Sequence, residues 1–434
     1  MLRYAGSVVC VLLLTFACLT SAQDASPSPI TADSAEQIAQ LAVWDGMAFP
    51  PENILFNDDL TGFLTYSEAG ELALWSVGTD HMPTLIHTTP AIRYALSQQQ
   101  VVYQTSGEDL TLHFWDLVSG TEYFTLDNAA TQTQLAWNAD GTRLAYITQD
   151  ETIEVWDIPS QERLQVHSLD GSQVRALDFL PGSGDLLMQT YRTTGITLET
   201  RSFEDRNRNF FIQTGVQLFE NVLFSPDGST VFMTEWFYPP GESGIINLTH
   251  AWNPQYAGTF QGGKLGFLPN GLLYSSTAVG YSDRQVTITL RDPVTLEVRA
   301  TFVYGGDVPT AASHWSFSPD GTRLVTVTWN FAAEGGRSDL DKRAYTFWDV
   351  EAQQALATTE PLDSAGVIAF SPDSTILAID IRQQIALWDA QTGNLLTMLN
   401  GHSASITRLI FSTDGTRLLS LDDDGAIRIW GMPD

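Results

Sequence analysis

The residue types that most often carry catalysis are scattered through this chain without a catalytic spacing. Its 7 histidines form no H-E-x-x-H metal motif, and the nearest pair, His81 and His87, flanks a predicted strand. The Gly-x-Ser-x-Gly motif of hydrolases is absent from the sequence, as are the P-loop and dinucleotide-binding glycine patterns. The sequence therefore predicts no catalytic residue, no metal site, no cofactor and no enzymatic activity.

One run of carboxylates, Asp422-Asp423-Asp424-Gly425, offers the hard oxygen ligands that calcium prefers. The same letters are typical of a tight turn, because Gly reaches positive φ without steric cost and Asp bonds the local backbone. We interpret the run as a turn between two strands. Acid–base pairs formed by carboxylates from distant segments stay open, since the chain has 51 Asp and Glu residues.

The charge balance of the chain is strongly acidic. It carries 21 Lys and Arg against 51 Asp and Glu, a net charge of −30, and its only lysines are Lys264 and Lys342. Nucleic-acid binding depends on Lys and Arg that neutralise phosphates, so we expect no nucleic-acid partner. Such a surface favours solubility, cations, basic partners or a salty habitat.

The N-terminus has the composition of a secretory signal peptide. Arg3 precedes a short apolar run, Val8 to Leu19, and the small residues Thr20-Ser21-Ala22 follow it. We predict a signal peptide over residues 1–22 and a linker over 23–37. The protein is then exported, and we expect it to be extracellular, at the cell surface or periplasmic.

Both cysteines, Cys10 and Cys18, lie inside this leader, so the mature chain has no disulfide and no thiol. A lipid anchor at Cys18 is the alternative to cleavage after Ala22. No other apolar run is long enough for an integral membrane span.

A turn related to SPDGT is repeated along the chain. Its copies begin at Trp137, Phe224, Phe317, Phe370 and Phe411. The copies at Phe317 and Phe411 read FSPDGTRL and FSTDGTRL, and apolar runs precede and follow each copy. This pattern indicates a strand–turn–strand unit. Alternation with a period of two after Ile38 predicts an all-β domain over residues 38–434.

Tryptophan recurs with a spacing of 40 to 42 residues in two series, which are Trp75, Trp115 and Trp156, and then Trp348, Trp388 and Trp430. Between the series lies Trp252, 96 residues from each neighbour. Each gap contains one unit without Trp, ITLETRSF from Ile196 and VTITLRDP from Val286. We therefore count nine units.

The Trp-Asp dipeptide at four of these tryptophans, together with the period, resembles the WD40-repeat family. The resemblance covers essentially all of the chain after Ile38. It implies a single closed β-propeller of nine four-stranded blades, with eight as the alternative if one middle unit forms no blade. In this family each repeat supplies the outer strand of one blade and three strands of the next. A strand from Ile38 to Trp44 should therefore pair beside Ala426 to Trp430 and complete the last blade.

The family also forms a hydrogen-bonded network of Asp, His, Ser or Thr, and Trp inside a blade. Only the last unit matches it, and the resemblance implies a structural tetrad of His402, Ser420, Asp424 and Trp430. In the other units the His is missing, so we expect the network to be partial or replaced by apolar packing.

Three consecutive units have long connections between their second and third strands, beginning near Trp236, Ala278 and Trp329. In the family such loops lie on one face, and exposed aromatic residues on loops are typical of recognition surfaces. The predicted partner-binding residues are Trp236, Phe237, Tyr238, Tyr281, Trp329 and Phe331. The alternative is that these aromatic side chains only pack against one another.

These observations favour a secreted, non-enzymatic WD40-like propeller that acts as a scaffold for a protein or peptide partner. The alternative is an extracytoplasmic hydrolase of glycans or peptides with acidic residues at the central channel. A third interpretation is a calcium- or salt-stabilised structural protein of the cell surface.

Overall fold

The computed structural model describes residues 28–433 apart from several short stretches. Those outside the description are 46–53, 58, 68, 98–99, 106–109, 132, 139, 170, 180–184, 193–194, 202–210, 214–218, 225–229, 236–241, 248–254, 262–264, 277–284, 306–309 and 331–341. The regular secondary structure of the described residues consists of strands and one short 3₁₀ helix, η1 (Ala35–Gln37). The all-β prediction is therefore confirmed. No helix in these ranges is long and apolar enough to cross a membrane.

The repeated SPDGT stretch forms the predicted hairpin turn. Between β25 (Thr310–Phe317) and β26 (Arg323–Asn330), Gly321 has a φ of 73° and its N–H donates to the Ser318 carbonyl over 2.9 Å. The Asp320 carboxylate accepts a hydrogen bond from the Thr322 N–H over 3.0 Å. The turn thus satisfies its own backbone and holds the two strands antiparallel.

Most of the strands form four-stranded antiparallel sheets whose strands are neighbours in sequence. The first two of these sheets are formed by β9 (Leu135–Trp137), β10 (Arg143–Ile147), β11 (Thr152–Asp157) and β12 (Glu162–Ser168), and by β13 (Gln173–Phe179), β14 (Leu186–Arg192), β15 (Gly195–Arg201) and β16 (Phe211–Gln213). The next two are formed by β17 (Phe219–Phe224), β18 (Thr230–Glu235), β19 (Glu242–Asn247) and β20 (Gln255–Gln261), and by β21 (Leu265–Phe267), β22 (Leu273–Ser276), β23 (Gln285–Arg291) and β24 (Val298–Gly305). The units at Ile196 and Val286, which lack Trp, therefore form sheets like the others.

Two further sheets follow in the same order. One consists of β25, β26, β27 (Lys342–Asp349) and β28 (Gln354–Thr358), with the short strand β29 (Leu362–Asp363) also paired to β27. The other consists of β30 (Ile368–Phe370), β31 (Ile376–Ile381), β32 (Gln384–Asp389) and β33 (Leu395–Asn400).

A 7-stranded path joins the first two units of the chain. Its strands are β2 (Ile54–Phe56), β3 (Gly62–Tyr66), β4 (Glu71–Val77), β5 (Pro83–Ser97), β6 (Gln100–Thr105), β7 (Leu112–Asp116) and β8 (Thr121–Leu126). The 15-residue strand β5 pairs with β4 as far as Pro90 and with β6 from Ala91 onward. One continuous strand thus serves two sheets, and the change of partner occurs at a proline that has no N–H to donate.

The last sheet is completed by the N-terminal strand, as the sequence predicts. Its order is β1–β36–β35–β34, with β1 (Ala39–Trp44), β34 (Ile406–Phe411), β35 (Arg417–Asp422) and β36 (Ile427–Gly431). The strands β1 and β36 are antiparallel, with Ala39 opposite Gly431 and Trp44 opposite Ile427. Strand β1 therefore covers an edge of β36 that would otherwise be unpaired.

Residues 28–37, part of the stretch predicted to be a linker, instead pack against the last two sheets. Ile30 and Ala35 are each 1% exposed and belong to one core cluster with Leu418 and Trp430. The Ile30 N–H donates to the Gly415 carbonyl over 2.8 Å. The linker prediction is wrong for these residues because apolar Ile30 and Ala35 have a buried surface to occupy.

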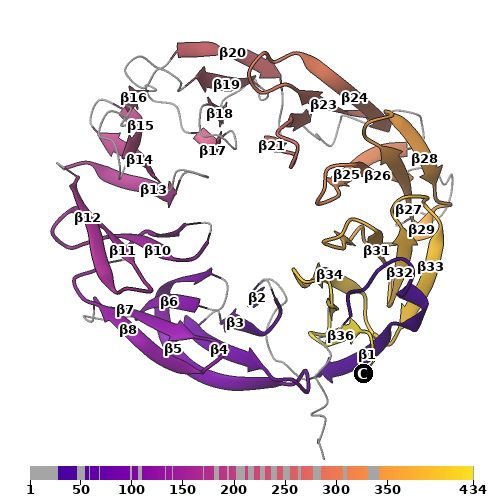
Figure 1. Ribbon diagram of the computed structural model, residues 1–434, viewed down its shortest axis with the longest axis horizontal. Helices are drawn as coiled ribbons and strands as arrows, with labels where there is room; N and C mark the ends of the chain where they lie inside the picture. The colour runs from indigo at the N-terminus through magenta and orange to yellow at the C-terminus, as the bar shows by residue number, and fades with distance from the viewer. Residues whose placement is uncertain are drawn as a thin grey trace, which may run out of the picture.

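The sheets stand around a common centre like spokes (Figure 1), with β17, β21 and β34 toward the inside and β20, β24 and β1 at the outside. The hydrophobic core is divided among the gaps between neighbouring sheets. In one gap, Ile376 and Ile385 of the sheet β30–β33 pack with Leu418 and Trp430 of the last sheet. Another cluster joins the last sheet to the first, since Leu419 and Leu421 pack with Ile54 and Phe63.

Candidate functional site

The last sheet contains a buried polar network that links two of its strands, β35 and β36, and the segment before β34. The Trp430 indole N–H donates to Ser420 Oγ over 2.8 Å. The His402 ring lies 2.6 Å from Ser420 Oγ through Nε2 and 2.8 Å from Asp422 Oδ2 through Nδ1. The acidic member is therefore Asp422 and not the predicted Asp424.

The reason for this difference lies in the alternation of side chains along β35. Ser420 and Asp422 are two residues apart on the strand and project to the same side of the sheet. Asp424 lies in the following turn and is exposed, whereas Asp422 is fully buried. The Asp422 carboxylate also accepts the Ala426 N–H over 2.8 Å, so it supports the turn as well as the histidine.

The positions of the protons in this network follow from the Trp430 indole N–H, which can donate a hydrogen bond but cannot accept one. The Trp430 indole nitrogen can only donate, so Ser420 Oγ accepts from it and keeps its own hydrogen for His402 Nε2. The proton of the His402 ring is then on Nδ1 and points to Asp422. Burial lowers the pKa of His402, against the opposing effect of the neighbouring Asp422 carboxylate, which favours this neutral ring.

The residue that corresponds to Ser420 keeps the same role in two other sheets. The Trp75 indole N–H donates to Thr65 Oγ1 over 3.2 Å, and the Trp348 indole N–H donates to Thr326 Oγ1 over 2.9 Å. In the sheet β30–β33 this position is Ile379, and the Trp388 indole nitrogen is buried without a hydrogen-bond partner among the described residues. The prediction of partial networks therefore holds in these three sheets.

In the sheet β9–β12 the acceptor for the tryptophan indole N–H is a carboxylate, that of Glu154. Tyr146 occupies the position of Ser420, and its hydroxyl donates to Glu154 Oε2 over 3.0 Å. The Trp156 indole N–H donates to the same oxygen over 2.9 Å. Arg163 of β12 donates to Glu154 Oε1 over 2.7 Å and neutralises the carboxylate. Sequence reasoning missed Glu154, although its place two residues before Trp156 puts both side chains on one face of β11.

A second buried carboxylate, Asp380 at the end of β31, organises the segment that leads into β30. It accepts hydrogen bonds from the Ser364 hydroxyl over 2.6 Å and from the N–H groups of Ala365 and Val367, each over 2.7 Å. Burial raises the pKa of Asp380, and these hydrogen bonds oppose the rise. The carboxylate therefore acts as a support for the backbone rather than as a solvent-facing acid.

These geometries can be set beside known proteins. Residues 393–431, which run from the end of one turn through the whole of β34, β35 and β36, match the family described as "WD domain, G-beta repeat". Residues 393–431 are thus similar to a single WD40 repeat. The matched WD40 repeat is the one that holds His402, Ser420 and Trp430 in one hydrogen-bonded network.

Several WD-repeat and other proteins are similar to parts of this chain. Protein ROOT INITIATION DEFECTIVE 3 of Arabidopsis thaliana is 34% identical over 131 residues, 29% of this chain and 30% of the relative. Telomerase Cajal body protein 1 of Homo sapiens is 35% identical over 163 residues, 36% of this chain and 28% of the relative. WD repeat-containing protein 18 of Rattus norvegicus is 25% identical over 118 residues, 26% of each protein. The matches thus span less than a third of each relative's length.

Among solved structures, the C-terminal WD40 domain of Sif2 is similar to this chain with a TM-score of 0.45 and 14% sequence identity. The match covers 92% of this chain and 99% of that one.

The side chains of the predicted partner-binding residues lie outside the described part of the structure. Trp236, Phe237, Tyr238, Tyr281 and Phe331 fall in stretches without a description, and of Trp329 only the backbone is described, within β26. The flanking strands show that each connection joins the second and third strands of its sheet, namely β18 to β19, β22 to β23 and β26 to β27. The predicted surface therefore stays a prediction.

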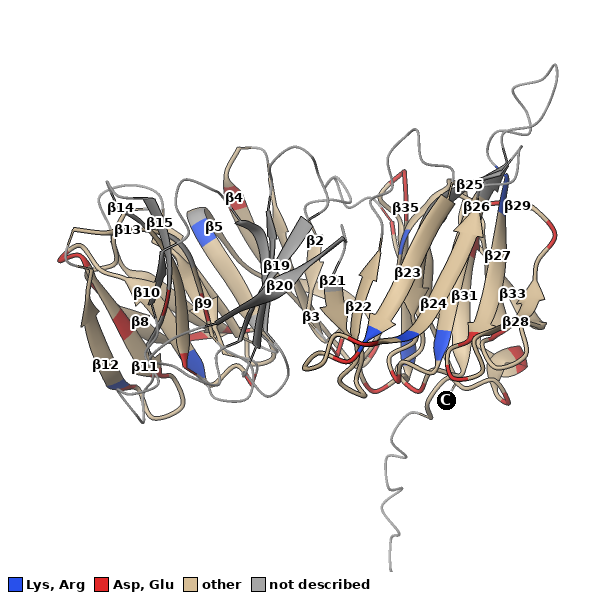
Figure 2. Ribbon diagram, turned by 90° about the horizontal axis from the view of Figure 1, so that it is seen from above, with Lys and Arg blue, Asp and Glu red and all other residues tan. Residues whose placement is uncertain are grey.

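Acidic residues gather along the turns at the lower edge of the sheets around β23 and β24 in Figure 2, with a few basic residues between them. Most of the carboxylates in these turns accept hydrogen bonds from backbone N–H groups. Asp292, for example, accepts the N–H groups of Val294 and Thr295 over 3.0 and 2.9 Å. Among the described residues, no group of three or more His, Cys, Asp or Glu side chains is placed to hold a metal ion.

Proposed function

We propose that this chain is a non-enzymatic scaffold that binds a protein or peptide partner on a closed WD40 propeller. The observation that carries the proposal is the WD40 repeat over residues 393–431, since propellers of this family serve as rigid supports for recognition surfaces. The core clusters support such rigidity where the structure describes them, because buried side chains join the sheet β30–β33 to the last sheet and the last sheet to the first.

We also propose nine four-stranded blades, of which the first two share β5. The support is the division of β5, whose first half pairs only with β4 and whose second half pairs only with β6. Contacts between the first and last sheets support closure. Arg408 of β34 donates to the Ile54 carbonyl of β2 over 2.6 Å, and the Trp44 indole N–H donates to the His81 carbonyl over 2.6 Å.

Export is part of the proposal and rests on the leader over residues 1–22. N-terminal sequencing of the exported protein should begin at Gln23. Recovery of a lipid on Cys18 would instead establish the anchored form.

The binding role can be tested with an affinity column that carries residues 23–434. The column should retain a protein from the culture medium of the source organism, and the purified pair should form a complex of fixed stoichiometry by light scattering. A column of the same chain unfolded in urea and then washed serves as control. Failure to retain any protein, or turnover of glycans or peptides by the purified chain, would overturn the scaffold role.

A further inference from the structure

A cleft of about 660 Å³ lies between the sheets β21–β24 and β25–β28, at the edge where β25 turns into β26 and β27 into β28. Its buried lining is apolar and includes Leu290, Ala300 and Val350. Its exposed lining is polar and includes Asn270, Arg299, Glu351 and Gln353. The cleft is on the edge opposite to the connections between second and third strands, because successive antiparallel strands turn at alternate edges.

The neighbouring gap has a glycine at the same position of the corresponding turn. Between the sheets β25–β28 and β30–β33, Gly393 lies so close to the cross-strand pair Phe347 and Ala357 that a Cβ on it would be 2.5 Å from Ala357 Cβ. The corresponding pair in the open gap is Leu290 and Ala300, which line the cleft.

The residue that corresponds to Gly393 is Gln353, which also has a positive φ, of 53°. Its side-chain amide reaches across the gap and donates to the Arg299 carbonyl over 3.2 Å. A side chain at this position prevents the close approach that glycine permits. The cleft lies beside this turn, and the apolar residues at its floor, Leu290, Ala300 and Val350, are only 1%, 6% and 7% exposed.

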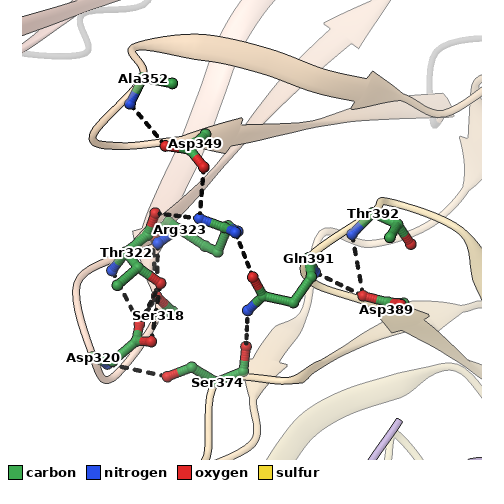
Figure 3. Close-up of polar contacts among 10 residues, drawn as sticks. All are labelled: Ser318, Asp320, Thr322, Arg323, Asp349, Ala352, Ser374, Asp389, Gln391 and Thr392. Atoms are coloured by element: carbon green, nitrogen blue, oxygen red, sulfur yellow. Dashed lines mark hydrogen bonds and ion pairs between the residues drawn. The ribbon is translucent and has the colours of Figure 1, made fainter. Parts of the chain in front are cut away.

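The wall of the cleft is held by a network around Arg323 (Figure 3). The guanidinium donates to Asp349 Oδ2 over 3.0 Å and to the Thr322 carbonyl over 3.0 Å, and its other nitrogen donates to Gln391 of the next sheet. The Gln391 amide continues to the Ser374 carbonyl over 3.3 Å. Arg323 is only 16% exposed, so its charge is used within the protein.

The charges that line the cleft are predominantly negative. They comprise two cations, Arg299 and Arg323, and three carboxylates, Asp320, Asp349 and Glu351, a net charge of 2 − 3 = −1. Asp320 and Asp349 are already engaged by the turn and by Arg323. Within the described part of the chain, Glu351 has neither a hydrogen-bond nor an ion-pair partner.

We propose that this cleft receives an Arg or Lys side chain of a peptide partner. The aliphatic stem of such a side chain enters the cleft above the nearly buried floor of Leu290, Ala300 and Val350, and its charged end pairs with the exposed Glu351. The net charge of −30 on the whole chain attracts a basic partner at long range. The inference rests on the proposed scaffold function and names the chemistry of one contact.

The test uses the whole mature chain and three labelled pentapeptides, acetyl-Gly-Gly-X-Gly-Gly-amide, in which X is arginine, citrulline or glutamate. Citrulline has the shape of arginine without its charge. By fluorescence anisotropy the arginine peptide should bind about fivefold more tightly than the citrulline peptide, as one half-exposed ion pair allows. The glutamate peptide should bind more weakly still.

Substitutions of Glu351 test whether this residue makes the contact with the peptide. Glu351→Gln should remove the preference for arginine over citrulline, and Glu351→Lys should favour the glutamate peptide. The control is Glu162→Gln, at the exposed first residue of β12, which should keep the preference.

Equal binding of the arginine and citrulline peptides, an unchanged preference in Glu351→Gln, or tighter binding of a neutral sugar such as maltose would each overturn the proposal. The affinity column distinguishes failure of the cleft proposal from failure of the proposed scaffold function. A column of Glu351→Gln that still retains the partner at full strength would reject the cleft and leave the scaffold role standing.

Discussion

The last sheet and the sheet β9–β12 both present a tryptophan from the third strand to the second, yet they bind its indole N–H with different acceptors. In both, the residue opposite the tryptophan is a leucine, Leu418 for Trp430 and Leu144 for Trp156. Two residues further along the second strand come Ser420 and Tyr146. The small serine leaves room for a histidine to reach it, whereas the tyrosine fills that room and turns its hydroxyl to Glu154.

The two sheets show that different oxygens can accept the hydrogen bond of the indole. A buried indole N–H without an acceptor costs about 1–3 kcal/mol. The acceptor can be a hydroxyl of the neighbouring strand, as in Ser420, or a carboxylate of the same strand, as in Glu154. The repeat therefore forms without the histidine where another oxygen accepts the indole N–H, and in the sheet β30–β33 also where Trp388 has no acceptor among the described residues.

The two sheets also differ in how they obtain their outer strand, and truncation should expose this most strongly. The sheet β9–β12 takes β12 from its own segment, whereas the last sheet takes β1 from the other end of the chain. A chain that begins at Met47 lacks β1, and loss of Trp44 alone should cost about 3–5 kcal/mol. We expect a sharply lower thermal midpoint and aggregation through the exposed edge of β36.

Two other truncations refine this result. A chain that begins at Ser28 keeps every described contact and should melt like the mature protein. A chain that begins at Ile38 loses buried Ile30 and Ala35, which should cost about 1.5–3 kcal/mol for the isoleucine. Similar melting of all three by calorimetry would show that β1 does not support the ring.

Much of this fold is predictable because it depends on local chemistry that repeats. The Asp-Gly turns, the alternation of the strands and the spacing of Trp predict the sheets, including those at Ile196 and Val286. The continuity of β5 is less visible, because Pro90 in its middle is usually a sign of an interrupted strand. The burial of Ile30 depends on a surface formed by residues almost 400 positions later, which no local pattern contains.

The carboxylates of the two networks should differ in their value to stability. In Asp422→Ala the fully buried His402 and Ala426 N–H both lose their acceptor, so we expect a loss of about 2–4 kcal/mol. In Glu154→Ala the half-exposed Arg163 regains water, so we expect about 1–3 kcal/mol. Asp424→Ala is the matched control, with a change within about 0.5 kcal/mol for an exposed residue.

Urea unfolding of the three variants measures these differences. An effect of Asp424→Ala as large as that of Asp422→Ala would restore Asp424, the residue that the sequence favoured, as the acidic member of the network.

The sequence names His402, Ser420 and Trp430 through the family pattern. It leaves three adjacent aspartates as candidates for the acidic member, and the position at which β35 ends decides among them. Glu154 escapes prediction because the pattern has no carboxylate at that position.

The smallest effect, and the most specific, is a dependence of stability on pH that belongs to the last sheet. Burial lowers the pKa of His402 in the folded protein, and Arg428 lowers it further, against Asp422 and Asp45. The unfolded chain then binds a proton near the ordinary histidine pKa of about 6.5, while the folded chain still excludes it. Stability should therefore be full above about pH 6.5 and fall as the pH decreases toward the folded pKa, by at most about 1.4 kcal/mol per pH unit.

His402→Gln isolates this contribution, because glutamine fills a similar space without titrating. The variant should be less stable at neutral pH, and the difference between the two proteins should shrink as the pH decreases from 7.5 to 5.5. His87, whose pKa is also lowered by burial, is present in both proteins and cancels in the comparison. Glu154 and Tyr146 belong to a network without histidine, so Glu154→Ala should keep the same pH dependence as the parent chain. Parallel curves for the parent and His402→Gln would mean that His402 is not held neutral, and the proton arrangement derived from Trp430 would be wrong.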